Sequence, residues 1–282
     1  MKSGFVALIG RSNVGKSTLL NNLIGSKIAI TSPKAQTTRQ SIQGVLNDER
    51  GQIVFVDTPG VLQKRDMLTK RLLQIAKSTL NHVDIIVYVV DPTREIGSEE
   101  KFILHLLHGI KAQKVLCINK IDDPRPDFIE SYRAMASDFD AIVEVSALRL
   151  TNLKLLTNQL FEFLPEGAPL YPVGQLTNLT NEQLIAELIR EKLFLRLHDE
   201  VPYGLHVEVD DMKERGNGDL YIHAIIFTND ERHKRYIIGL GGRGIKEIGQ
   251  ATRKDLENIT QKHVYIELEV EFDEHWVERL GS

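Results

Sequence analysis

Residues 10–17 (GRSNVGKS) form the most distinctive grouping of chemically able side chains in this sequence. They fit the pattern G-x-x-x-x-G-K-[ST] and lie between an expected strand (FVALIG) and an expected helix (STLLNNL), which is the context of a phosphate-binding loop. Glycines let backbone N–H groups turn toward phosphates, Lys16 supplies a charge, and Ser17 offers a hydroxyl to Mg²⁺. We expect the nucleotide to contact Asn13, Val14, Gly15, Lys16, Ser17 and Thr18.

A second motif, residues 57–60 (DTPG), follows the apolar run IVFV. At the end of a strand, the Asp57 carboxylate can hold Mg²⁺ through water, and the Gly60 N–H can face the γ-phosphate. The motif therefore predicts a sensor of the γ-phosphate. We expect the nucleotide to contact Asp57, Thr58, Pro59 and Gly60.

Two later motifs predict which base is bound. In residues 119–122 (NKID), the Asp122 carboxylate can accept hydrogen bonds from N1–H and the exocyclic amine of guanine, a donor pair that adenine lacks. Because unpaired buried polar groups are costly, Asp122 predicts GTP rather than ATP. Residues 146–148 (SAL) would close over the base with backbone N–H groups. The expected base contacts are Asn119, Lys120, Asp122, Ser146, Ala147 and Leu148.

Thr37 and Thr38 lie between the two phosphate motifs, where a nucleotide-dependent switch segment would present a hydroxyl to Mg²⁺. We favour Thr38, and the sequence leaves Thr37 open. The expected metal ligands are Ser17, Thr38 and Asp57. The expected catalytic residues are Lys16, Thr38 and Gly60.

Val61 follows DTPG at the position where Ras-like enzymes carry the glutamine that orients the attacking water. An alkyl side chain cannot do this work, so we predict slow intrinsic hydrolysis, assisted by another group, a bound ion or a partner. Asn13 favours a bound ion as the assisting group, because its carbonyl, beside the phosphates, could help to hold K⁺. Simple turn formation by Asn13 is the alternative, and the sequence leaves both open.

Alternating strands and helices must position these motifs. From residue 4 to about residue 164, apolar runs such as FVALIG, IVFVDT and DIIVYVVD alternate with helical stretches such as residues 68–80. This order predicts an α/β domain with a mostly parallel sheet covered on both faces. The run PEGAPLYP resists both helix and sheet and indicates a linker. We expect a P-loop GTPase domain at 1–166, a linker at 167–180 and a second domain at 181–282.

The second domain is predicted to run helix, strand, strand, helix, glycine loop, helix, strand. Its first helix should bury an apolar stripe made of Leu184, Ile185, Leu188, Ile189 and Leu195. Residues 239–242 (GLGG) place a GXXG loop between two helices, the arrangement of a smaller α+β KH domain of type II. Between residues 232 and 254, seven basic residues face one acidic residue, which favours a groove for single-stranded RNA. The expected RNA contacts are Arg232, Lys234, Arg235, Gly239, Leu240, Gly241, Gly242, Arg243 and Lys246.

Bulk composition sets the limits of these expectations. The chain has 282 residues, of which 42% are hydrophobic and 26% charged, with a formal net charge of −4. The charge gives no support to a wholly basic nucleic-acid binder, so an RNA site has to be argued locally. No run approaches the apolar length of a membrane span, and we expect a cytoplasmic protein. The single cysteine, Cys117, lies in KVLCIN and is predicted to be a buried strand residue.

Together, GRSNVGKS, QTTR, DTPG, NKID, the stretch ELIREKLFLRLHDEVPYG and the GXXG loop resemble the Era family of ribosome-associated bacterial GTPases, of the TrmE-Era-EngA-like superfamily, over essentially the whole chain. The resemblance implies GTP and GDP as ligands with Mg²⁺, binding to the 3′ region of small-subunit ribosomal RNA, and assistance to small-subunit assembly and maturation. It implies nucleotide control of RNA binding by a monomer, with no DNA partner and at most peripheral contact with a membrane.

Two positions depart from the family pattern. Leu240 stands inside the GXXG loop where the family usually has lysine, and Gly244 stands where a basic residue is frequent. The departure at Leu240 keeps an alternative open, in which the KH domain of this GTPase mainly binds protein. Salt-dependent RNA binding would separate the two functions.

Overall fold

The computed structural model describes residues 1–282 except 33, 35–40, 59, 61–73, 75 and 277–282. Thr37, Thr38, Pro59 and Val61, to which the sequence assigns roles, lie outside the described residues, as does most of the helix expected at 68–80. The chain divides into two compact units, Met1–Asn178 and Leu179–Ser282. No helix in the part of the chain that the structure describes has the length and apolar character needed to cross a bilayer.

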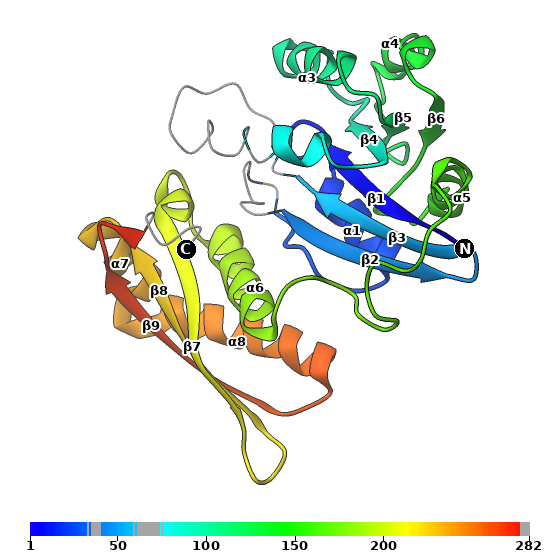
Figure 1. The fold of residues 1–282 in the computed structure, drawn as a ribbon. Coiled ribbons are helices and arrows are strands. Elements are labelled where there is room, and N and C mark those ends of the chain that lie inside the picture. Colours follow the sequence, from blue (N-terminus) through cyan, green and yellow to red (C-terminus); the bar gives the residue numbers. More distant parts are fainter. Residues whose placement is uncertain (33, 35–40, 59, 61–73, 75, 277–282) are drawn as a thin grey trace. The chain divides into compact units, whose positions relative to one another are not determined.

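The first unit is built on a six-stranded sheet with the order β2-β3-β1-β4-β5-β6 (Figure 1). All neighbouring strands are parallel except β2 and β3, which form an antiparallel pair. The sheet confirms the predicted mostly parallel α/β architecture. The strands are β1 (Lys2–Ile9), β2 (Ile42–Asp48), β3 (Gly51–Asp57), β4 (Ile85–Val90), β5 (Gln113–Ile118) and β6 (Ala141–Glu144).

Burial explains why these apolar runs became strands. Every residue of β3 and β4 is buried, as expected for strands covered on both faces. On one face, Ile103 and Leu107 of α3 and Tyr132 of α4 pack against alternate residues of β1, β4 and β5. Cys117 is buried in β5, which agrees with its predicted place. The helices of this unit include α1 (Lys16–Ile24), α3 (Ser98–His108), α4 (Ile129–Arg133) and α5 (Leu153–Phe163).

Parallel strands bring the motifs to one edge of the sheet. Residue 10 follows β1, and Asp57 is the last residue of β3. Residues 119–122 follow β5, and residues 146–148 come shortly after β6. In such sheets, ligands bind outside the carboxyl ends of the strands, where the strand order reverses. The order β3-β1-β4 places this reversal at β1, which leads directly into the P-loop.

The proline-containing segment 165–178 lies along the edge strand β2. Val45 N donates to Leu176 O at 2.9 Å, and Gln43 N donates to Asn178 Oδ1 at 2.8 Å. Gln52 is 1% exposed and its Oε1 accepts from the backbone N–H groups of Leu170 and Tyr171 at 2.8 and 2.9 Å. This segment therefore supplies the hydrogen bonds that an edge strand would otherwise lack.

The second unit contains a three-stranded sheet, β7-β8-β9, with helices on one of its faces. β7 and β8 form an antiparallel hairpin, whereas β9 runs parallel to β8. The element order is the one predicted for the KH domain. The elements are α6 (Asn181–Arg196), β7 (Leu205–Glu214), β8 (Leu220–Thr228), α7 (Glu231–Ile238), α8 (Arg243–Thr260) and β9 (Val264–Phe272).

Helix α6 begins with a capping box. Gln183 N donates to Thr180 Oγ1 at 3.3 Å, and Thr180 N donates to Gln183 Oε1 at 3.0 Å. One expectation for its apolar stripe is wrong, because Leu195 is 49% exposed. A spacing of four residues continues the stripe from Ile185 and Ile189 to Leu193, which is fully buried.

Candidate functional site

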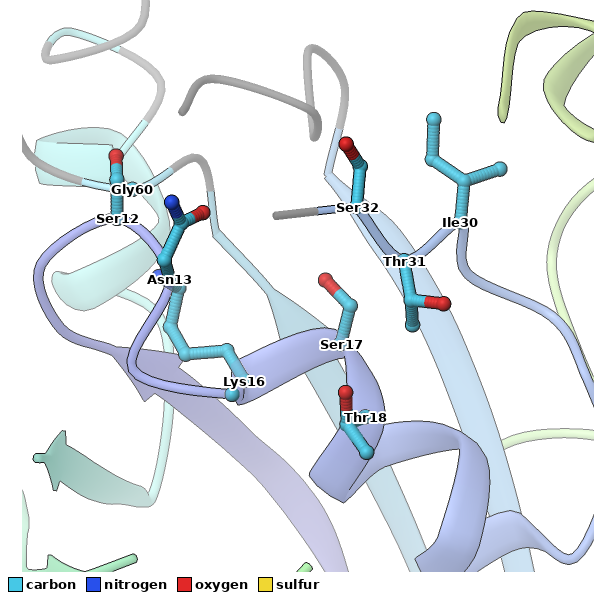
Figure 2. Close-up of a pocket in the computed structure, with 10 residues that line it drawn as sticks. Ser12, Asn13, Lys16, Ser17, Thr18, Ile30, Thr31, Ser32 and Gly60 are labelled. Carbon is cyan, nitrogen blue, oxygen red and sulfur yellow. The ribbon is translucent and has the colours of Figure 1, made fainter. Parts of the chain in front are cut away.

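The P-loop connects β1 to α1 and presents backbone N–H groups at the first turn of the helix. Gly15 caps α1 with φ 99°, and a side chain there would also collide with the Asn119 amide. Lys16 Nζ donates to the carbonyls of Gly10 and Arg11, both at 3.0 Å, so the lysine folds back along the loop. Figure 2 shows this loop with Ser17 and Thr18 at the start of the helix.

Burial changes the acidity of the P-loop lysine. Lys16 is 6% exposed, and burial lowers the pKa of its ammonium group to about 8, while the charge of Asp57 opposes part of the shift. A bound phosphate would restore the preference for the charged form. Lys16 is therefore poised to meet an anion, and its proton is coupled to phosphate binding.

Ser17 and Asp57 meet where a nucleotide-bound cation would be held. Ser17 Oγ donates to Asp57 Oδ2 at 2.8 Å, and Asp57 is fully buried. Such oxygen ligands suit Mg²⁺, which prefers hard donors and keeps several waters. Next to it, Thr58 Oγ1 donates to Leu8 O at 2.8 Å, which ties the DTPG motif to β1.

Gly60 lies against the P-loop. A Cβ atom built on Gly60 would come 2.6 Å from Ser12 Oγ and 3.0 Å from Ser12 Cα. Only glycine allows this approach, and both residues line the same pocket. The pocket is lined by Ser12, Asn13, Gly15, Lys16, Ser17, Thr18, Ile30, Thr31, Ser32 and Gly60 (Figure 2).

The NKID motif connects the P-loop to the loops that are expected to contact the base. Asn119 Nδ2 donates to Val14 O at 2.8 Å, and Asn119 Oδ1 accepts from Ala147 N at 2.9 Å. Lys120 Nζ donates to Asn13 O at 2.8 Å and to Asp91 Oδ2 at 2.5 Å. Asn119 and Lys120 therefore hold the P-loop, the loop at Ala147 and the residue after β4, Asp91, in fixed relative positions.

Asp122 and the SAL loop are also brought together. Ser146 Oγ donates to Asp122 Oδ1 at 2.5 Å and accepts from Arg149 N at 2.9 Å. Asp122 is exposed, whereas Ser146 is fully buried. The side chain of Leu148 is 70% exposed, so its contribution to a base contact would come from its backbone or from closure over the ring.

Sequence reasoning missed several residues that support this site. Ser12, a variable position of the P-loop motif, and residues 30–32, which lie outside the motifs, also line the pocket. Asp91 is 2% exposed and holds Lys120; burial alone would raise its pKa, but hydrogen bonds from Lys120 and Thr93 keep that pKa below its usual range. Its signal was available, since Asp91 ends the run DIIVYVVD just as Asp57 ends IVFVD.

The GXXG loop connects α7 to α8 in the second unit. Gly239, Gly241 and Gly242 have φ values of 72°, 58° and 77°, a region that side chains disfavour. The loop ends at the first residue of α8, whose N-terminal N–H groups favour an anion. Leu240 is 85% exposed at the outer side of this loop.

Gly244 proves to be a packing position. A side chain there would collide with Ile237 O and would come 3.1 Å from Arg196 Cζ. A basic residue at 244 would have to displace these neighbours. The glycine at this position therefore does not deprive the loop of an outward-pointing cation. The neighbouring Arg196 donates to Glu247 Oε2 at 2.9 Å and is a further cation beside the loop that the motif did not reveal.

The basic residues among the predicted RNA contacts differ in whether they form ion pairs within the protein. Arg232 donates to Asp230, with Nη2 to Oδ2 at 2.7 Å, so its charge is partly engaged. Within the described residues, no ion pair engages the remaining four cations of the predicted set. These are Lys234, Arg235, Arg243 and Lys246.

Known families match both parts of the chain. Residues 5–120 match the family described as "50S ribosome-binding GTPase", and residues 200–277 match the KH domain family. "GTPase Era" of Halothermothrix orenii is 42% identical over 282 residues, covering 99% of this chain and 96% of that protein. "GTPase Era" of Caldanaerobacter subterraneus subsp. tengcongensis is 43% identical over 279 residues, covering 98% of this chain and 94% of that protein.

Two solved structures share the whole architecture. One is Era in complex with MgGDPNP and nucleotides 1506–1542 of 16S ribosomal RNA, with a TM-score of 0.92 and 37% identity over 99% of this chain and 96% of that one. The other is a single-residue variant of Aquifex aeolicus Era bound to GDP.AlF4⁻, with a TM-score of 0.92 and 36% identity over the same shares.

The fold and the assembled motifs define a P-loop GTPase that carries a C-terminal KH domain. Hydrolysis of GTP is the activity of this class. The sequence identity over nearly the full length is far above what a shared fold alone requires. The chain belongs to the Era family of GTPases.

Proposed function

We propose that this GTPase is a nucleotide-controlled switch that binds the 3′ region of small-subunit ribosomal RNA and assists small ribosomal subunit assembly and maturation. The observation that carries the proposal is the match, at TM-score 0.92 over 99% of the chain, to Era holding both MgGDPNP and nucleotides 1506–1542 of 16S ribosomal RNA. The geometry within the P-loop and the geometry within the glycine loop, each taken by itself, also support the proposal.

We infer the following roles at the nucleotide site. Backbone N–H groups of residues 13–18 cradle the phosphates, Lys16 neutralises charge on the transferred phosphoryl group, and the Gly60 N–H reports the γ-phosphate. Mg²⁺, held through Ser17 and Asp57, would neutralise charge that develops on the phosphate oxygens. Asp122 would accept both guanine donors, with Ser146 holding the carboxylate in place.

Water activation requires a group other than Val61. Asn13 lines the pocket together with Gly60, and its side-chain carbonyl would lie beside the bound phosphates. We propose K⁺ as the ion held there. GTP turnover measured in K⁺ and in Na⁺ tests this: we expect faster turnover in K⁺, and equal rates would refute the potassium role. Asn13→Ala should abolish any difference between the two ions.

RNA binding is assigned to the glycine loop and its cations. Lys234, Arg235, Arg243 and Lys246 would contact phosphates, while the loop backbone lets the strand approach closely. The proposal is tested by titrating a single-stranded RNA matching the small-subunit rRNA 3′ end against the full chain, loaded with a GTP analogue or with GDP. Tighter binding in the GTP-like state, compared with a scrambled RNA, is the expected result; equal or absent binding would refute the switch.

One observation favours a second candidate function. Leu240, 85% exposed in the loop, suits contact with an apolar partner surface, so the KH domain could serve mainly to bind protein. Salt separates the two functions, because RNA affinity must fall as salt rises while apolar protein contact does not.

The proposal also includes a monomeric, cytoplasmic protein with at most peripheral membrane contact and no DNA partner. Sedimentation across a range of protein concentrations tests the monomer. A DNA oligonucleotide of the same sequence tests the preference for RNA, because the two differ at the 2′-hydroxyl and the thymine methyl.

A further inference from the structure

Two large apolar side chains stand exposed beside the glycine loop. Tyr236, near the end of α7, is 66% exposed, and Leu240, in the loop, is 85% exposed. They are four residues apart, and Arg232 lies four residues before Tyr236 on the same side of α7. Exposed aromatic and aliphatic groups on one short stretch of chain are candidates for contact with a partner.

The ring of Tyr236 differs from those of Tyr265, which is also exposed, and Tyr221, which is half-buried. Tyr265 stacks on His263 with centroids 5.0 Å apart and lies 4.7 Å from the Arg215 guanidinium. Tyr221 likewise has Arg215 at 4.9 Å and Lys213 at 5.0 Å from its ring centroid. Within the residues that the structure describes, no ring stacks on Tyr236 and no cation lies over it, so its faces are open to a ligand.

The surroundings of Tyr236 indicate the chemistry of that ligand. Lys234 and Arg235 precede it, and Arg243 and Lys246 lie just beyond the glycine loop, all four outside the ion pairs of the described residues. Open cations around an open aromatic face match a single-stranded nucleic acid, whose phosphates and bases need both. A protein partner would match the apolar pair but would leave the cations unexplained.

We propose that Tyr236 is a base-stacking residue, on whose ring one unpaired base of the bound RNA lies, with Leu240 packing against the same nucleotide. This rests on the proposed RNA-binding function and adds a contact to it: the glycine loop and cations hold phosphates, whereas Tyr236 holds a base. Stacking is tolerant of base identity, so Tyr236 adds affinity at one position of the strand more than it selects a sequence.

Alanine and phenylalanine substitutions separate the ring from its hydroxyl. The full chain, loaded with a GTP analogue, is titrated with the rRNA 3′-end oligonucleotide. Tyr236→Ala should weaken binding by about 5-fold to 100-fold, the range of a lost base stack, and Tyr236→Phe should bind like the native chain. Leu240→Ala should weaken binding less. Tyr265→Ala is the matched control and should leave affinity unchanged.

Salt dependence distinguishes stacking from charge. Tyr236→Ala should lower affinity equally at all salt concentrations and keep the slope of log affinity against log salt. Lys246→Ala should reduce that slope by about 0.7, the value for one phosphate contact on a single strand. A changed slope for Tyr236→Ala would contradict the stacking role.

An abasic scan of the RNA locates the stacked base. At one position, removing the base should weaken binding to the native chain but not to Tyr236→Ala, since the same contact is already lost. If Tyr236→Ala binds like the native chain, or if no abasic position couples to it, the inference fails while the proposed function stands. If the native chain binds no RNA, both fail. Unchanged GTP hydrolysis and melting temperature show that the variants are folded.

Discussion

The Ser146 hydroxyl donates to Asp122 Oδ1, and because each carboxylate oxygen can accept two hydrogen bonds, both oxygens of Asp122 remain able to accept from a guanine base. Asp122→Asn replaces one acceptor by an N–H donor, which opposes the guanine amine but matches the C2 carbonyl of xanthine. GDP affinity should fall about 10-fold to 100-fold, since one buried pairing is lost, and XDP affinity should rise. Fluorescence titration with both nucleotides measures this. Asp123→Asn, one residue further on, is the control and should keep the preference for GDP.

Lys16 gives nucleotide binding a pH dependence of a defined sign. Burial lowers the pKa of this lysine to about 8 when no phosphate is present, whereas a bound phosphate favours its charged form. Affinity is therefore fully present below pH 8 and falls as pH rises beyond it, by up to about 10-fold per unit. GDP binding measured from pH 7 to 9 tests this. Lys16→Arg keeps its charge in this range, so a fall of equal size in that variant would contradict the assignment.

At the scale of elements, helix α3 supports the P-loop from outside the pocket. Arg11 Nε pairs with Glu99, and Arg11 Nη1 lies 3.3 Å from Glu100 Oε1. Glu100 is 3% exposed, and its other oxygen accepts from Gly97 N at 2.9 Å. Since Lys16 donates to the Arg11 carbonyl, the pair on α3 also restrains the loop that holds the lysine.

Arg11→Gln should therefore loosen the P-loop. We expect GDP to dissociate about 5-fold faster and the melting temperature to fall, because charge-assisted bonds to largely buried carboxylates are worth about 1.5–3 kcal/mol. Stopped-flow release of a fluorescent GDP measures the rate. Arg133→Gln breaks an ion pair with Glu144 on the surface of the same domain and should not change GDP release. Equal effects of the two variants would show that Arg11 has no special relation to the site.

The nucleotide motifs could be predicted because each combines fixed residue types with a strand ending. Asp57, Asn119 and Ser146 are recognised from local sequence, and the parallel sheet then brings them together. The partners of Arg11 could not be predicted, since Glu99 and Glu100 approach it only through the tertiary fold. Asp91, the partner of Lys120, does end an apolar run as Asp57 does, but its pairing with Lys120 also depends on the tertiary fold.

Other contacts also depend on the tertiary fold. The proline-rich run forms neither helix nor strand, as predicted, but its sequence does not reveal that Gln52 accepts from the backbone N–H groups of Leu170 and Tyr171. Gly244 resembled a lost cation in the sequence, and only the crossing of α7 and α8 reveals that no side chain fits there. Periodicity alone placed Leu195 in the core, because it does not specify how far toward the end of a helix the packing extends.

At the scale of the whole molecule, β2 connects two parts of the proposed switch. Ile42 begins β2 a few residues after Thr38, and the same strand bonds to residues 176–178, just before the second unit begins at Leu179. A nucleotide-dependent change near Thr38 could therefore reach the start of the KH unit through backbone hydrogen bonds. We expect this path to contribute to nucleotide control of RNA binding.

Gln52→Ala tests this path. It removes the acceptor of two backbone N–H groups in segment 165–178, so the segment should loosen while the P-loop and the glycine loop stay intact. The ratio of RNA affinities in the GTP-analogue and GDP states should fall toward one, with GDP affinity unchanged. Gln175→Ala, which removes an amide that donates to nearby Thr177 O, is the control. A native ratio in Gln52→Ala would show that the anchoring of this segment by Gln52 plays no part in nucleotide control.

The parallel pairing of β9 with β8 imposes an order on events during synthesis. The first unit is complete once Asn178 has emerged from the ribosome, but the core of the second unit closes only when Phe272, the last residue of β9, is available. At about 5–20 residues per second, this interval is on the order of 10 s. The nascent chain therefore passes through a stage in which it holds nucleotide but has no glycine loop supported by a core. We therefore expect RNA binding by the second unit to begin only after the first unit has become able to bind nucleotide.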